Sequence, residues 1–427
     1  MRRLWRNTLA AVVLVAAVAS AAVWVLNRRD EQPIGEGQSF SASPAQIERG
    51  RYLANAGNCV ACHTARGGAA YAGGRAIETP FGTLYAGNLT PDAQTGLGGW
   101  TADHFWRAMH NGRSRDGRLL YPAFPYPNYT QVTREDSDAL FAYLQSLPPV
   151  AQQNRPHALR FPYNTQAALA VWRALFFTPG EFEPRADKPA EWNRGAYLVR
   201  GLGHCTACHA ARNMFGATSE NLELSGGLIP MQNWYAPSLA SAEEAGVAEW
   251  ETAHVVQLLK AGVSPQASVM GPMAEVVYRS TQHLSDADAQ AMAVFLKDLP
   301  QTPQQAPREP VRATPAEMAR GAKFYEQHCA QCHGEAGEGA GKAYPPLAGN
   351  RAVTMAVPAN LIRVVLSGGY PPATAGNPRP YGMPPFSPVL DDAEVAAVVT
   401  FIRGSWGNGA EPVSHLDVLR YRRGAAQ

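Results

Sequence analysis

The chain has few charged residues and no long run of one sign. Of its 427 residues 17% are charged, and the formal net charge is +2. Nucleic-acid-binding proteins carry a basic stripe or patch, so nucleic acid is a poor partner for this sequence. Alternating strand patterns of any length are also lacking, whereas glycine (39) and proline (34) are plentiful. These features predict an all-α body of short helices and shaped loops.

Cysteine is scarce as well, with six residues in the whole chain. The six form three pairs with two residues between the partners: Cys59 and Cys62, Cys205 and Cys208, Cys329 and Cys332. A histidine follows each pair directly: His63, His209 and His333. No cysteine is left over, and a disulfide framework would be unusual in a chain of this length.

The Cys-x-x-Cys-His pattern is typical of covalent haem attachment. Two thioether bonds hold haem c, and the two-residue spacing on a turn entering a helix brings both sulfurs to one porphyrin edge. The adjacent histidine then supplies one axial nitrogen to the iron. A redox dithiol needs no following histidine, and the pairs lie too far apart in sequence for the usual zinc spacing. We therefore predict three covalent haems c.

A second axial ligand, often methionine, is expected on the loop before the last helix of each haem-binding unit. In the third unit Met383 fits, just before a predicted helix that begins near Asp391. In the second unit both Met270 and Met273 are available, and the interpretation that we favour is Met273.

The first unit departs from this pattern. Phe124 occupies the position where methionine is expected, and phenylalanine cannot bind iron. Met109 and His110 lie in a predicted helix over 101–111 and are candidate ligands, with His104 a further option. The alternative is that Met109 is a core residue and His110 a surface residue. The first haem then has five ligands, or a sixth that the sequence hides.

The body of the chain repeats one pattern three times. An Arg-Gly pair with nearby aromatic residues precedes each cysteine motif, and a predicted capped amphipathic helix closes each unit. We predict three domains, over 43–150, 188–302 and 314–410. A packed, helical segment over 151–187 bridges the first two, a Pro-rich linker over 303–313 joins the last two, and the tail over 411–427 has no clear pattern.

One long uncharged run is present near the N-terminus, from Thr8 to Leu26. A bilayer-spanning helix needs roughly 20 apolar residues, and this run is of about that length. The arginines that precede it favour a cytoplasmic N-terminus, with the body in the periplasm. A cleaved signal peptide is the alternative, with residues 19–21 as the cleavage site. Because the apolar run continues to Leu26, we favour a single inner-membrane anchor within residues 1–31.

Several further motifs make the chain resemble the three-haem cytochrome c subunits of membrane-bound bacterial dehydrogenases that oxidise alcohols, gluconate, sorbitol or aldehydes. The resemblance covers about 46–410 and includes the following segments: Gly57–Thr64, Thr79–Thr83, Asn88–Asp92, Gly271–Val277 and Ser405–Asn408. It implies three class I cytochrome c-like domains in tandem. It also supports Met273 and Met383 as axial ligands. At Phe124 the sequence departs from the alcohol and gluconate subunits and resembles relatives paired with molybdenum hydroxylase-type dehydrogenases.

The resemblance implies that a separate catalytic subunit, of PQQ, FAD or molybdenum type, oxidises the substrate. This chain would relay the electrons to ubiquinone or another respiratory carrier. No nucleotide fingerprint or catalytic-triad motif is present in the sequence, so we expect no chemistry of its own. The alternative is a haem enzyme, or a binder of small ligands, that uses an open first haem.

Overall fold

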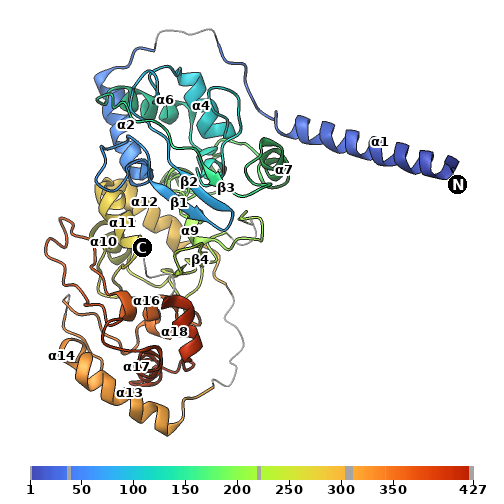
Figure 1. Ribbon diagram of the computed structural model, residues 1–427. Helices are drawn as coiled ribbons and strands as arrows, with labels where there is room; N and C mark the ends of the chain where they lie inside the picture. The colour runs from blue at the N-terminus through green and yellow to red at the C-terminus, as the bar shows by residue number, and fades with distance from the viewer. Residues whose placement is uncertain (1, 36–39, 219–222, 303–310, 342, 423–427) are drawn as a thin grey trace. The chain divides into compact units, whose positions relative to one another are not determined.

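The computed structural model describes residues 2–35, 40–218, 223–302, 311–341 and 343–422 (Figure 1). The chain divides into two compact units. The first contains Met1–Ala54, Cys62–Glu183 and Arg200–His204. The second contains Asn55–Ala61, Pro184–Val199 and Cys205–Gln427.

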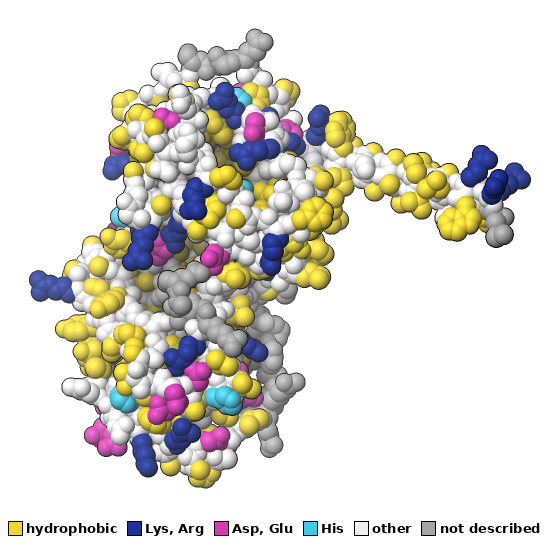
Figure 2. Space-filling view, in the orientation of Figure 1, with side chains coloured by type: hydrophobic (Ala, Val, Ile, Leu, Met, Phe, Trp, Pro, Cys, Tyr) yellow, Lys and Arg dark blue, Asp and Glu magenta, His cyan; other side chains and the backbone are white. Residues whose placement is uncertain are grey.

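The N-terminal helix α1 (Arg2–Leu26) is the longest element of the first unit, and none of its side chains is buried. Hydrophobic side chains cover most of its length (Figure 2). By length and composition it is long and apolar enough to cross a membrane. A signal sequence has the same properties.

Three helix pairs repeat along the chain. The opening helices are α2 (Pro44–Ala56), α8 (Ala190–Ala196) and α13 (Pro315–His328), and the closing helices are α6 (Arg134–Gln145), α12 (Asp286–Lys297) and α17 (Asp392–Gly404). Each closing helix begins at a predicted cap, because the side chains of Thr133, Ser285 and Asp391 accept a hydrogen bond from the backbone N–H three residues later. The sequence prediction of capped closing helices is therefore confirmed.

Each opening helix crosses its closing helix at a glycine, the one that follows the arginine in the repeated pair. A Cβ on Gly50 would lie 1.8 Å from the carbonyl oxygen of Ala139. The corresponding distance is 2.0 Å from Gly195 to Ala291 and 2.2 Å from Gly321 to Ala397. A side chain at these positions would force the helices apart. The repeated Arg-Gly pair thus contains the contact point of the two helices.

The second opening helix contains an irregularity. After α8 the chain forms a π-helical segment, η1 (Tyr197–Leu202), before Cys205. A π-helical turn contains one more residue than an α-helical turn, so it absorbs an inserted residue without breaking the helix. Of the three sequence repeats, the second (residues 188–302) has the longest spacing between the glycine of the Arg-Gly pair and the first cysteine of the motif. The π-helical segment accommodates this longer spacing.

The all-α prediction was too narrow, because the described part of the chain contains two small antiparallel sheets. One has the order β1 (Ala76–Thr79), β2 (Gly82–Tyr85) and β3 (Ala158–Leu159), and the other pairs β4 (Gly227–Ile229) with β5 (Trp234–Ala236). Strands this short show no readable alternation in sequence. The molecule remains helix-rich.

The remaining elements are short helices. They are α3 (Cys59–Cys62), α4 (Ala102–Asn111), α5 (Tyr126–Tyr129), α7 (Gln166–Phe176), α9 (Thr206–His209), α10 (Thr252–Ala261), α11 (Pro272–Arg279), η3 (Thr281–His283), α14 (Ala330–His333), α15 (Arg351–Thr354), α16 (Ala359–Ser367) and α18 (His415–Arg422). Helices α4 and α7 match the helices predicted over 101–111 and in the bridging segment.

Helix α18 was not predicted, although the tail carries a cap for it. Ser414 accepts a hydrogen bond from the Asp417 N–H, and the Asp417 carboxylate accepts one from the Ser414 N–H. Val418 and Tyr421 are buried in a hydrophobic core of the second compact unit. Most of the predicted Pro-rich linker (residues 303–310) and part of the segment after α1 (residues 36–39) lie outside the described residues.

Candidate functional site

Each Cys-x-x-Cys-His motif forms a short helical turn, and each histidine turns its Nδ1 atom toward a backbone carbonyl. His63 Nδ1 lies 2.7 Å from the Gly87 carbonyl oxygen, and His209 Nδ1 lies 2.7 Å from that of Pro237. His333 Nδ1 lies 3.0 Å from the Pro345 carbonyl oxygen. A carbonyl oxygen only accepts, so Nδ1 carries the proton and Nε2 has the lone pair that a metal needs.

The surroundings of the three imidazole rings favour the neutral form that binds metals. Burial lowers the pKa of His63, His209 and His333, against a smaller opposing effect of the hydrogen bond to the carbonyl. Among the residues that the structure describes, Nε2 of these rings has no hydrogen-bond partner. Each ring is therefore fixed at one nitrogen and available at the other.

The six cysteines form no disulfide with one another, and most are partly exposed. Burial raises the pKa of Cys205 to about 12 and that of Cys329 to about 11, with a smaller contribution from the neighbouring cysteine. The reactive cysteines of redox dithiols have a lowered pKa, so this environment argues against that function. A neutral thiol beside a histidine with an available Nε2 suits attachment of haem, since the S–H bond adds across a vinyl group.

Another donor near the second motif suits the same group. Arg212 lies three residues after His209, and its Nη1 atom is buried without a hydrogen-bond partner among the described residues. A buried guanidinium nitrogen without a partner is costly unless an acceptor is present. A haem propionate would be such an acceptor, so the residues present fit haem c.

The backbone of Met383 forms an antiparallel bridge with Gly369. Its N–H donates to the Gly369 carbonyl at 2.9 Å, and the Gly369 N–H donates to the Met383 carbonyl at 3.0 Å. The preceding helix α16 ends at Gly368, which has a φ of 61°. Met383 and Cys329 pack against the same hydrophobic core. The fold thus brings the predicted sixth ligand to the core that also holds the third motif.

In the second haem-binding repeat (residues 188–302) the two candidate methionines, Met270 and Met273, differ in position. Met273 lies in the first turn of α11, directly after Pro272. The methyl carbon of Met270 instead lies 3.2 Å from where a Cβ on Gly369 would be, so it contacts the loop of Met383. Met270 is therefore occupied in the packing between the second and third motif regions.

In the first unit His110 is engaged at both ring nitrogens. Its Nδ1 lies 2.9 Å from the Thr130 carbonyl oxygen, and its Nε2 lies 3.0 Å from Asp30 Oδ2. The ring is buried and stacks on Trp106. Met109 is buried in α4, and the His104 side chain takes part in the capping box with Thr101. His110 is thus a buried structural residue, so the alternative interpretation of it as a surface residue was wrong.

Phe124 takes part in an aromatic cluster. Its ring centroid lies 5.3 Å from that of Tyr129, which in turn lies 5.5 Å from the ring of His204. His204 directly precedes Cys205 and has a φ of 40°. No sequence pattern pointed to a function for His204, and only the tertiary contact with Tyr129 reveals its position.

Two asparagines of the family-like motifs are buried and bind the backbone. Asn88 Nδ2 donates to the Val150 carbonyl at 2.8 Å, and its Oδ1 accepts from the Thr90 N–H at 2.9 Å. Asn408 Nδ2 donates to the carbonyls of Leu347 and Ile402 at 2.9 Å. These motifs hold loops together, which the sequence alone did not indicate.

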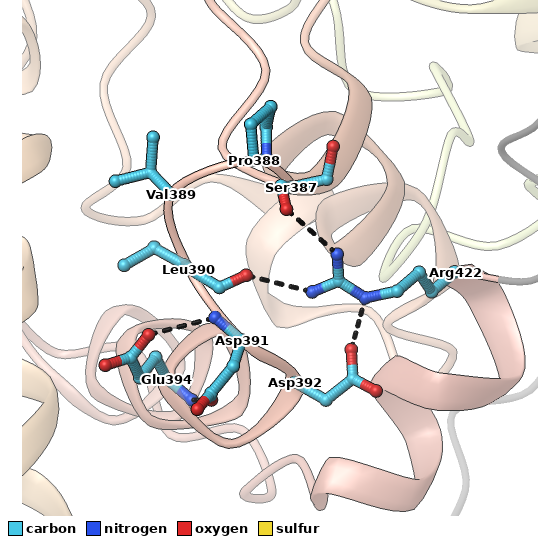
Figure 3. A pocket seen from close by; sticks show the side chains of 8 residues that line it. All are labelled: Ser387, Pro388, Val389, Leu390, Asp391, Asp392, Glu394 and Arg422. Atoms are coloured by element: carbon cyan, nitrogen blue, oxygen red, sulfur yellow. Dashed lines mark hydrogen bonds and ion pairs between the residues drawn. The ribbon is translucent and has the colours of Figure 1, made fainter.

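A surface hollow with a volume of about 460 Å³ lies beside Arg422 (Figure 3). The Arg422 guanidinium is occupied by Asp392 and by the carbonyls of Ser387 and Leu390. The hydrogen bonds of the Arg422 guanidinium therefore hold α18 against the start of α17 and the loop before it. The hollow holds none of the predicted site residues.

Comparison with known proteins gives a consistent result. A family profile named Cytochrome c matches residues 47–148 and 318–406. The chain is 38% identical to the cytochrome c subunit of the quinone alcohol dehydrogenase of Gluconobacter oxydans over 406 residues, which cover 91% of this chain and 84% of that protein. It is 38% identical to the gluconate 2-dehydrogenase cytochrome c subunit of Pantoea cypripedii, with 90% of each chain covered. It is 40% identical to a nicotinate dehydrogenase subunit of Pseudomonas putida, over 93% of this chain and 33% of that protein.

Proposed function

Because the chain belongs to the family of cytochrome c subunits of bacterial dehydrogenases, we propose that it relays electrons through three covalent haems c. The electrons come from a catalytic dehydrogenase subunit and pass to ubiquinone or another respiratory carrier. The single observation that carries the proposal is the repeated histidine geometry. Three rings, each following a Cys-x-x-Cys pair, hold Nδ1 on a backbone carbonyl and leave Nε2 for iron.

The residues that would hold the groups follow from the motifs. The thioether bonds are to Cys59 and Cys62, Cys205 and Cys208, and Cys329 and Cys332, and the proximal nitrogens come from His63, His209 and His333. Met383 and Met273 are the proposed sixth ligands of the third and second haems. Haem iron supplies a one-electron couple, and a methionine ligand raises its potential.

The preference for Met273 has structural support. The Met270 side chain is directed to Gly369 and packs on the loop of Met383. A methionine whose side chain packs on that loop is not available as a ligand to the iron of the second haem. Met273, at the start of α11 behind Gly271 and Pro272, has no such commitment among the described contacts.

We also propose that α1 is a retained anchor, with the body in the periplasm. The arginines before the apolar run favour a cytoplasmic N-terminus. Residues that follow the run are packed into the first unit, since Asn27 is buried and binds Arg173. Three domains in tandem, over 43–150, 188–302 and 314–410, complete the proposal, and the three helix pairs support them.

The experiment that tests the function is a titration of the isolated complex. A haem assay and an anaerobic potentiometric titration should give three haems per chain, and substrate oxidation by the co-purified catalytic subunit should reduce all of them. A chain that carries haem but accepts no electrons from a co-purified dehydrogenase would refute the electron-relay proposal.

A second candidate function rests on the first haem alone. Phe124 cannot bind iron, and both nitrogens of His110 are engaged by other groups. An iron with one open position would bind carbon monoxide when reduced. A full carbon monoxide shift at one haem favours a ligand-binding or enzymatic function, whereas no shift excludes it.

A further inference from the structure

Helix α7 lies in the bridging segment (residues 151–187), within the first compact unit. Its charged side chain is buried and its exposed side chains are mostly apolar, the reverse of the usual arrangement in a surface helix. Its sequence from Gln166 to Phe176 has one charged residue, Arg173, and that side chain is only 4% exposed. The outward positions follow at intervals of four and are apolar: Ala167, Val171 and Leu175. The surface helix of a soluble protein places its charges outward and its apolar side chains inward. The outward face of α7 therefore suits an apolar environment.

Neighbouring residues extend this apolar face. Phe161 is 81% exposed and Leu175 68% exposed, and Tyr163 is also exposed. Tyr163 packs on Phe81, with 4.5 Å between the ring centroids. We call the exposed side chains of Phe161, Tyr163, Val171 and Leu175 the α7 patch. Aromatic side chains next to aliphatic ones are typical of the boundary between lipid tails and headgroups.

The end of α1 is fixed to α7. Asn27, the first residue after α1, donates from Nδ2 to the Ala170 carbonyl at 2.9 Å. Arg173 Nε donates to Asn27 Oδ1 at 2.9 Å. Arg113 holds the same segment, through the Asn27 carbonyl at 3.0 Å and the Glu31 carboxylate at 2.8 Å. The inward position of Arg173 thus has a cause, because it binds the residue at which the apolar run ends.

The arrangement of the two helices follows from these contacts. Figure 1 shows α1 lengthwise and α7 at its foot, viewed nearly along its own axis. A helix that crosses the end of a membrane-spanning helix lies along the membrane surface. Arg28, which packs over Trp24 at 4.4 Å, and Arg29 follow α1 directly. If α1 spans a membrane, their charges are placed to meet lipid phosphates.

We propose that the α7 patch inserts into the outer surface of the phospholipid bilayer at the foot of α1. The proposal rests on the proposed retention of α1 as an anchor. The patch and the anchor together would hold the first haem unit in one orientation on the membrane, whereas a single helix leaves it free to swing. Apolar burial at the interface supplies the binding energy, in the manner of amphipathic helices that lie in the headgroup region.

The test uses the full-length chain in vesicles of phosphatidylethanolamine and phosphatidylglycerol. A photo-crosslinking benzophenone amino acid replaces Leu175, and a matched control carries it in place of Glu135, an exposed residue on α6 of the same unit. We expect lipid adducts at position 175 that exceed those at position 135 severalfold. In a second pair the probe replaces Val171, and Leu175→Glu should reduce its lipid adducts severalfold, whereas Leu175→Ile should not.

The remaining outcomes separate this inference from the proposed function. Release of the chain from the vesicles by an alkaline carbonate wash overturns the anchor and the patch together. Retention of the chain without lipid adducts at position 175 overturns the patch alone. In the isolated complex, adducts of position 175 with the catalytic subunit in place of lipid also overturn it. Haem reduction by substrate, measured in the isolated complex with its catalytic subunit, reports on the electron relay independently of all three results.

Discussion

The first and third motif regions share one half of a haem site and differ in the other. On the proximal side His63 and His333 both hold Nδ1 on a carbonyl. As the proposed sixth ligand the third region offers Met383, whereas the corresponding residue of the first region is Phe124, which takes part in an aromatic cluster. Both loops follow a helix with a glycine of positive φ at its C-cap, Gly112 and Gly368, with φ values of 58° and 61° but ψ values of 39° and −155°. The two loops thus leave their helices in different directions, and one contains a proposed iron ligand where the other contains an inert side chain.

The comparison teaches that the two halves of a site are specified separately. The cysteine motif fixes the proximal half within five residues of sequence and one downstream carbonyl. The other half depends on a single side chain in a loop, so it can change without disturbing attachment. We expect attachment to be alike in the two regions and their potentials to differ.

The largest expected effect comes from removing a proximal ligand. His63→Ala should leave the first iron without an identified protein ligand, so its redox step disappears from a potentiometric titration. His333→Ala leaves Met383 in place, so the third step should shift or weaken while the other two steps remain. His415→Ala, at an exposed histidine of α18, is the control and should change nothing. Equal effects of the two substitutions would contradict the difference between the regions.

Exchanging the distal side chains should exchange the properties of the two haems. Met383→Phe should lower the third potential on the order of 100 mV, a fraction of the roughly 0.8 V that axial ligands cover. Phe124→Met should raise the first potential and abolish any carbon monoxide binding there. The measurement is potentiometry with the methionine-to-iron charge-transfer band as a marker. Phe124→Leu is the control, since leucine cannot bind iron. If leucine shifts the potential of the first haem as much as methionine does, position 124 is not the place of the sixth ligand.

Filling the helix crossings should destabilise both regions. In Gly50→Ala and Gly321→Ala the new methyl group meets a carbonyl oxygen of the closing helix, at 1.8 and 2.2 Å before relaxation. Overpacking of this kind costs about 1–3 kcal/mol in the free energy of unfolding. Denaturant unfolding checks this cost. Gly180→Ala and Gly409→Ala serve as controls, because a Cβ there meets no atom within 4 Å, and an equal loss in the controls would exclude the crossing as the cause.

The smallest expected effect concerns the caps of the closing helices. Thr133→Ala and Asp391→Ala each remove the acceptor for one backbone N–H, at a cost of about 1 kcal/mol. Asp391→Asn and Thr133→Ser keep an acceptor and should retain most of the stability. Thermal unfolding of the four variants measures the difference, and alanine variants as stable as the wild type would show that the caps contribute nothing.

Much of the helical frame was readable from sequence because its signals are local. The caps at Thr133, Ser285 and Asp391 and the amphipathic pattern behind them predicted three closing helices, and the structure contains them. The small sheets and α18 were missed. Strands of two to four residues carry no periodic signal, and α18 depends on the burial of Val418 and Tyr421 in a core that other segments form.

Some properties of the candidate site were likewise predictable from sequence, and others depended on tertiary contacts. The sequence could name Met109 and His110 as alternatives to Phe124, because residue type alone permits them as ligands. It could not show that Thr130 and Asp30 occupy both nitrogens of His110, since these partners are 20 and 80 residues away. The sequence favoured Met273 over Met270, and only the structure adds that Met270 contacts the loop of Met383.

The sequence by itself determined which atoms can bind haem, because thioether attachment and the first axial nitrogen need only two cysteines and a histidine at fixed spacing. The tertiary structure decided how those atoms are presented. The carbonyls that fix His63, His209 and His333 come from residues 24, 28 and 12 positions away. It also decided that Arg173 points inward and Leu175 outward, since a hydrogen bond to Asn27 across the fold outweighs the usual preference of a charge for water.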